Sequence, residues 1–141
     1  MNRKWILTLA AVSVIALCVT AVGGWYSAKA ENGTKDIQYV LYLGTNDKDT
    51  NLPVFTPEEA KAKVREILIR HFGGYTLQEA EGGWIGDDGT LYEEHTIVIY
   101  LSDTTLDKVH AAADEMIRIF NQSSVLIQAN ETTTEFYVSA E

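Results

Sequence analysis

The chain has 141 residues, of which 46% are hydrophobic and 22% are charged, and its formal net charge is −9. All twenty acidic residues follow Ala30, against eight of the eleven basic ones, so residues 31–141 carry a charge of −12. This charge disfavours nucleic acid and anionic membrane surfaces as partners. It either serves solubility alone, which is the commoner case, or favours cationic ligands, metal ions or basic partners. Residues 31–141 have the length of one domain with one modest core.

Residues 1–30 have the order of an export signal. Arg3 and Lys4 form a positive start, residues 5–25 are uncharged and mostly aliphatic, and residues 28–30 (Ala-Lys-Ala) resemble a signal-peptidase site. The segment is interpreted either as a cleaved signal peptide or as an uncleaved N-terminal membrane anchor, because the apolar run approaches the ~20 residues that span a bilayer. Both interpretations predict an extracytoplasmic chain, secreted or anchored to the cell membrane.

Cys18 is the only cysteine and lies inside the apolar run, with Leu17 before it. A lipobox has a small residue at that position, so lipoprotein processing is not expected. A mature chain without cysteine has no disulfide, and its stability depends on its core.

Residues 31–38 are polar and predict a linker, and a single domain is expected over residues 39–141. The segment FTPEEAKAKV predicts the start of the first helix, with Thr56 as N-cap, Pro57 at the first helical position and Glu59 completing a capping box. Gly73 is expected to end this helix. A second helix is expected after Asp103 or Thr104 as cap. Strands are predicted at residues 39–44, 75–85, 91–101 and 123–130, with a short fifth strand at residues 134–139 that turns back on the fourth.

The order β-α-β-β-α-β predicts an α+β, ferredoxin-like fold, in which two helices cover one face of an antiparallel sheet. The other face of the sheet has no element left to cover it. Strand alternation places Tyr92, Val98 and Tyr100 on that open face. An exposed apolar face often binds a partner, so the sequence predicts a weak homodimer or a protein partner there.

The stretch GGWIGDDGTLYEEHTIVIY holds the residues of greatest chemical interest. A two-residue turn at positions 88 and 89 would pair Trp84 with Glu93 and bring His95 into the same cluster, whereas a three-residue turn would pair Trp84 with Tyr92 and disperse it. Three roles are open for the cluster: a hydrogen-bonded pair at the edge of the core with a buried Trp84 as its lid, a binding site, or a catalytic site. One histidine and one glutamate are too few for a tight zinc site.

The loop DKDTNLPVFTPE resembles an EF-hand calcium loop in its alternating Asp47, Asp49 and Asn51. Leu52 stands where that loop has its turn glycine, and Pro53 follows it. These residues are therefore weak metal candidates, and no cofactor is expected.

Several short motifs occur in an order that resembles a bacterial domain-of-unknown-function family, number 3574. They are YLGT, FTPEE, HFGGYTLQEAEGGW, DDGTLYEE and FNQSSVLIQ. The resemblance implies a small, often exported domain, and it implies no activity because the family has none assigned. The absence of a lipobox cysteine is a departure that argues against lipid anchoring.

The function that these features favour is an exported binding or interaction domain without catalytic activity. The alternatives are a small enzyme, or metal-assisted site, that uses Glu93 and His95 beside Trp84, and a calcium-stabilised surface domain. The candidate binding residues are Trp84, Tyr92, Glu93, His95 and Tyr100.

The order of residues 1–30 predicts a mature chain that begins at Glu31. The intact mass of the protein recovered from the medium or the cell surface measures this directly. A membrane-bound species that still carries residues 1–30 would support the anchor instead.

Overall fold

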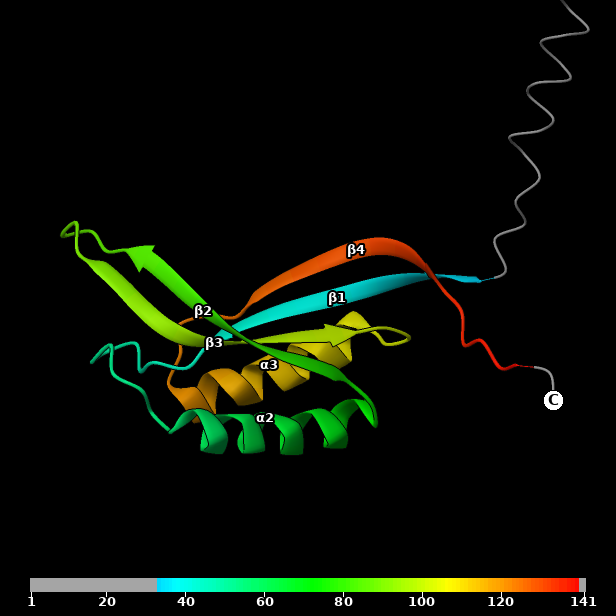
Figure 1. The fold of residues 1–141 in the computed structure, drawn as a ribbon, viewed down its shortest axis with the longest axis horizontal. Coiled ribbons are helices and arrows are strands. Elements are labelled where there is room, and N and C mark those ends of the chain that lie inside the picture. The colour runs from blue at the N-terminus through cyan, green and yellow to red at the C-terminus, as the bar shows by residue number, and fades with distance from the viewer. Residues whose placement is uncertain (1–32, 140–141) are drawn as a thin grey trace, which may run out of the picture. The chain divides into compact units, whose positions relative to one another are not determined.

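The computed structural model describes residues 33–139, which follow the predicted β-α-β-β-α-β order (Figure 1). The predictions for the export signal and for Cys18 fall outside these residues. None of the helices within residues 33–139 is long and apolar enough to cross a membrane. The elements are β1 (Thr34–Gly44), α2 (Pro57–Phe72), β2 (Thr76–Ile85), β3 (Leu91–Leu101), α3 (Leu106–Phe120) and β4 (Leu126–Thr134).

The four strands form one sheet in the order β2-β3-β1-β4, and each neighbouring pair is antiparallel. Helices α2 and α3 lie side by side against one face of this sheet (Figure 1). The arrangement is the ferredoxin-like α+β fold, which confirms the predicted fold class. We call the face toward the helices the helix face, and the other face the open face.

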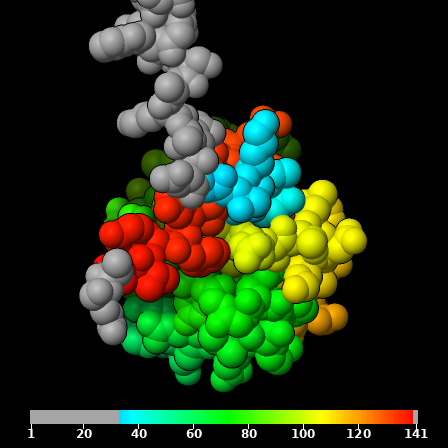
Figure 2. All heavy atoms as spheres, turned by 90° about the vertical axis from the view of Figure 1, so that its right-hand side faces the viewer, coloured from blue at the N-terminus to red at the C-terminus, as the bar shows by residue number. Residues whose placement is uncertain are grey.

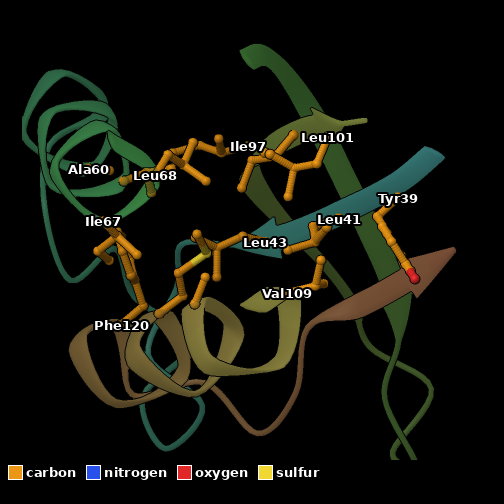
Figure 3. Close-up of a cluster of buried hydrophobic side chains, with 14 residues drawn as sticks. Tyr39, Leu41, Leu43, Ala60, Ile67, Leu68, Ile97, Leu101, Val109 and Phe120 are labelled. Carbon is orange, nitrogen blue, oxygen red and sulfur yellow. The ribbon is translucent and has the colours of Figure 1, made fainter. Parts of the chain in front are cut away.

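The core lies between the helix face and the two helices (Figure 3). Alternate residues of the two central strands point into it, and both helices contribute one apolar stripe. Its members are almost fully buried: Tyr39, Leu41 and Leu43 of β1, Ile97, Ile99 and Leu101 of β3, Ala60, Val64, Ile67 and Leu68 of α2, and Val109, Ala112, Met116 and Phe120 of α3.

Helix α2 begins and ends as its sequence predicts. The Thr56 side chain accepts a hydrogen bond from the Glu59 backbone N–H, while the Glu59 carboxylate accepts one from the Thr56 backbone N–H. Gly73 ends the helix in the left-handed conformation, with φ of 73°. Phe55, just before the cap, packs edge-on against Phe120 at 5.4 Å between ring centroids and so fixes the entry of α2 against α3.

Helix α3 begins one or two residues later than predicted. Its N-cap is Thr105 rather than Asp103 or Thr104, and the Thr105 side chain makes no capping hydrogen bond. Asp103 adopts a φ of 53° and its backbone N–H donates to the Asp36 carboxylate. The chain therefore turns out of the sheet at Asp103, and the helix starts correspondingly later in the sequence.

Strand β1 is longer than predicted, because the expected linker joins the sheet. Residues Thr34 to Gln38 pair with the second half of β4, from Asn130 to Thr134. The fourth strand therefore continues through the segment expected to turn back, and the described residues contain no fifth strand. Asn favours turns whereas Thr favours strands, and here the backbone hydrogen bonds between β1 and β4 outweigh the turn preference of Asn130.

The last described residues lie beyond β4 at the surface, beside the start of β1 (Figure 2). Phe136, Tyr137 and Val138 are 78–85% exposed. They therefore do not cover the open face of the sheet.

Ile67 and Ile69 provide a matched test of this core. Both are isoleucines of α2, but Ile67 is 1% exposed and Ile69 is 55% exposed. Ile67→Ala should lower the free energy of unfolding by about 2–5 kcal/mol, and Ile69→Ala by less than about 1 kcal/mol, because the change in helix propensity is shared and only Ile67 leaves a cavity. Urea denaturation measures both losses, and equal losses would contradict this packing of α2.

Candidate functional site

The turn between β2 and β3 decides how the candidate residues are arranged. Gly86 N–H donates to the Thr90 carbonyl at 2.9 Å, and Gly89, at φ of 80°, donates to the Gly86 carbonyl at 2.9 Å. This is a three-residue hairpin loop with glycine in the left-handed position. Of the two registers that the sequence allows, the chain adopts the one that pairs Trp84 with Tyr92 and Gly83 with Glu93.

Trp84 and Tyr92 therefore stack on each other on the open face. Their ring centroids are 4.7 Å apart and their planes differ by 23°. Trp84 is 50% exposed, so the expectation of a buried lid is wrong. The reason is the register, which places the indole on the face that no helix covers.

Glu93 and His95 lie on the helix face of β3, which separates them from Trp84. The acid beside His95 is Glu79 of β2: its carboxylate Oε1 lies 3.5 Å from the imidazole Nε2. The imidazole Nδ1 is buried and has no hydrogen-bond partner within residues 33–139. Glu79 could not be singled out from the sequence, because only the register brings β2 residues next to His95.

Glu79 is held on its other side by Lys61 of α2, whose ammonium group donates to the carboxylate at 2.6 Å. Lys61, followed by the smaller influence of His95, lowers the pKa of Glu79 from its ordinary value. The group joins β2, β3 and α2 at the edge of the core.

A hollow of about 550 Å³ lies on the open face, at the end of the sheet nearest the hairpin. Its aromatic and apolar walls are Tyr42, Trp84, Tyr92 and Leu126, and two loops, residues 46–51 and 122–124, complete it. Trp84 and Leu126 are both at least half exposed. We call this feature the hairpin hollow.

Glu94 is the carboxylate of β3 that lines the hairpin hollow. It lies directly over Gly44 of β1, where the Cβ of any other residue would overlap the carboxylate oxygens. Its Oε2 accepts a hydrogen bond of 3.3 Å from the Asn46 backbone N–H. Glu94 is not among the candidates predicted from the sequence, although strand alternation places it on the same face as Tyr92 and Tyr100.

Asp47, Asp49 and Asn51 of the calcium-like loop also line the hairpin hollow. The side chain of Asn121, the C-cap of α3, forms hydrogen bonds with two of them. Its side-chain amide donates to Asp47 at 2.7 Å and to Asp49 at 2.9 Å. The Asn121 amide, followed by the Asp49 backbone N–H, lowers the pKa of Asp47 from its ordinary value. The Lys48 ammonium group, followed by Asn121, does the same for the pKa of Asp49.

Asn51 contributes its backbone carbonyl to the side chain of Asn46, at 3.1 Å. Within residues 33–139, no three His, Cys, Asp or Glu side chains come close enough together to hold a metal ion.

The rest of the open face is less apolar than the sequence indicated. Val98 is only 5% exposed. The hydroxyl of Tyr100 donates to the Gln78 side chain at 3.2 Å, and that of Tyr42 donates to the Gln128 side chain at 3.1 Å. Among the aromatic residues of the open face, Trp84 at the hairpin hollow is therefore the exposed one.

The exposure of the stacked pair predicts a small cost of removing it. Trp84→Ala should lower the free energy of unfolding by about 1–2 kcal/mol, because an aromatic pair contributes ~0.5–1.5 kcal/mol and half of the indole already faces solvent. Thermal or urea unfolding measures the loss, with Trp84→Phe as the control that keeps the stack. A loss of about 3–5 kcal/mol would show instead that the indole is a core residue.

Comparisons with solved structures find the same fold in phage proteins. A phage SAM lyase in complex with S-methyl-5'-thioadenosine has 20% identity and a TM-score of 0.54, over 73% of this chain and 93% of that one. The apo state of a phage SAM lyase has 23% identity and a TM-score of 0.55, over 78% and 94%. At these identities the likeness shows the fold.

The periplasmic divalent cation tolerance protein CutA from Archaeoglobus fulgidus is more distant, with 10% identity and a TM-score of 0.48 over 73% of this chain and 88% of that one. The comparison with curated proteins finds no match. The family comparison is more direct, since residues 38–136 match the model described as "Protein of unknown function (DUF3574)". The match spans well over half of the chain, and the chain belongs to this family.

Proposed function

We propose that the chain is a binding domain that takes a small ligand in the hairpin hollow. The observation that carries this proposal is the half-exposed indole of Trp84, held flat by Tyr92 at the wall of a 550 Å³ hollow. Pockets for small ligands measure roughly 300–1,000 Å³ and combine aromatic walls with a few polar groups. The predicted export signal places this binding function outside the cytoplasm in our proposal.

Exposed aromatic surface is unfavourable in water, at roughly 25 cal/mol for each Å² left uncovered. A ligand that stacks on Trp84 would remove that surface from water without any change of the fold. The stacked ring of Tyr92 already restricts the indole, so little conformational entropy is lost on binding.

The runner-up is a small enzyme that uses His95. Its carboxylate partner would be Glu79 rather than Glu93, and its unpartnered Nδ1 is the observation in its favour. His95 belongs to the helix face and Trp84 to the open face, so the two proposals concern different surfaces. The calcium-stabilised domain remains a third proposal, for which a melting temperature that rises with added calcium is the test.

Nuclear magnetic resonance distinguishes the two leading proposals. In the ¹⁵N-labelled full-length chain, Trp84→Phe assigns the Trp84 indole signal among the three tryptophans of the sequence. Small aromatic fragments, together with S-methyl-5'-thioadenosine because a phage protein of the same fold was solved with it, should shift this indole and the backbone amides of Asn46 and Ser123.

Two variants serve as controls in this experiment. His95→Gln should leave the shifts unchanged, because His95 lies on the other face of the sheet, and Trp84→Ala should abolish them. Shifts that instead gather around His95 and Lys61, or no shift with any fragment, would contradict the proposal.

A further inference from the structure

We infer that the hairpin hollow selects a small, flat organic cation, with Glu94 as its counter-charge and Trp84 as its stacking surface. This inference rests on the proposed function and adds the chemical class of the ligand. Three observations support it: the charges that line the hollow, the lack of an ion-pair partner for Glu94, and the aromatic walls.

The charged groups of the hairpin hollow are three carboxylates and one ammonium group. Lys48, the ammonium group, is already engaged by Asp49 and by the Asn121 side chain, both at 2.9 Å. The Asn121 amide donates to both Asp47 and Asp49, and two backbone N–H groups of the same loop donate to Asp47. Lys48 offsets the charge of Asp49, and amide groups occupy both loop carboxylates, which leaves Glu94 as the carboxylate of the hollow with the fewest partners.

Glu94 is half-buried, and within residues 33–139 it forms no ion pair with Lys, Arg or His. Its one hydrogen bond, from the Asn46 N–H, is long at 3.3 Å and involves only Oε2. Removing a carboxylate from water is unfavourable unless it is paired. A cation beside Oε1 would supply the missing partner.

The glycine beneath Glu94 gives the carboxylate its position. A Cβ at Gly44 would overlap both carboxylate oxygens, so the side chain lies flat over β1 only because that residue is glycine. Gly82 stands opposite Glu94 in the β2–β3 pairing and adds no side chain on that side. The carboxylate and the aromatic rings of Trp84 and Tyr92 line the same hollow.

The aromatic wall suits a positive charge, because the faces of Trp and Tyr rings carry negative electrostatic potential and attract cations. A planar cation such as an amidinium can form two parallel hydrogen bonds to a carboxylate while its flat surface stacks on an indole. A neutral ring would stack equally well but would leave Glu94 unpaired. A bare metal ion would need several oxygen ligands and would make no use of the aromatic rings.

Benzamidine and benzamide provide the direct test, since they have nearly the same size and shape and differ by one charge. In the full-length chain carrying Trp5→Phe and Trp25→Phe, Trp84 is the sole indole, so its fluorescence reports on the hairpin hollow. We expect saturable quenching by benzamidine, with an affinity at least about tenfold above that of benzamide, which is the effect of one charge-assisted hydrogen-bonded pair. Added salt should weaken benzamidine binding more than benzamide binding.

Two variants separate the charge of Glu94 from its position. Glu94→Gln should remove the preference for benzamidine while benzamide binding persists. Gly44→Ala should weaken benzamidine binding several-fold with the fold retained, because the atom displaced is the end of a flexible side chain. His95→Gln, in another part of the sheet, should change neither ligand, and circular dichroism confirms that each variant is folded.

The outcomes that overturn the inference are distinct. Equal binding of the two compounds, or an unchanged preference in Glu94→Gln, would overturn the cationic class and leave the proposed binding site standing. Absence of quenching by either compound up to their solubility limit would overturn the inference and the proposed site together.

Discussion

The backbone pairing of β2 with β3 is the constraint on which the candidate site depends. One extra residue in the turn, with Gly89 in the left-handed conformation, sets Trp84 opposite Tyr92. A shift of one residue would carry Trp84 to a different partner and move the neighbouring side chains to the other face. The stack, the exposed indole and the hairpin hollow all follow from this single register.

The same register divides the chemistry of the sheet between its two faces. On the helix face, His95, Glu79 and Lys61 tie the hairpin to α2 at the edge of the core. On the open face, Glu94 and the stacked rings of Trp84 and Tyr92 lie in a hollow that water can enter. One face therefore stabilises the fold, and the other leaves polar and aromatic groups available for binding.

Local sequence signals were sufficient for much of the fold. The capping box at Thr56 and Glu59 and the left-handed glycine at Gly73 depend on neighbouring residues only, so α2 was predicted to the residue. Strand alternation assigned the buried face of β3 correctly. The linker before β1 and the fifth strand were wrong for one shared reason, since residues 34–38 and 130–134 find their hydrogen-bond partners in each other across the sheet.

The candidate site was harder to predict from the sequence than the fold was. Its composition was noticed in the segment from Gly82 to His95, but the two possible turns gave two different clusters, and a sequence does not choose between them. Glu94 and Glu79 were overlooked because their importance comes from Gly44 and His95, which belong to other strands. Contacts between strands decide which carboxylate is structural and which is open to a ligand.

The most direct test of this account is the pattern of nuclear Overhauser effects between the backbones of β2 and β3. The account predicts cross-strand contacts between Trp84 and Tyr92 and between Gly82 and Glu94. Contacts between Trp84 and Glu93 and between Gly82 and His95 would contradict it, because they would show the two-residue turn and would dissolve the hairpin hollow as described.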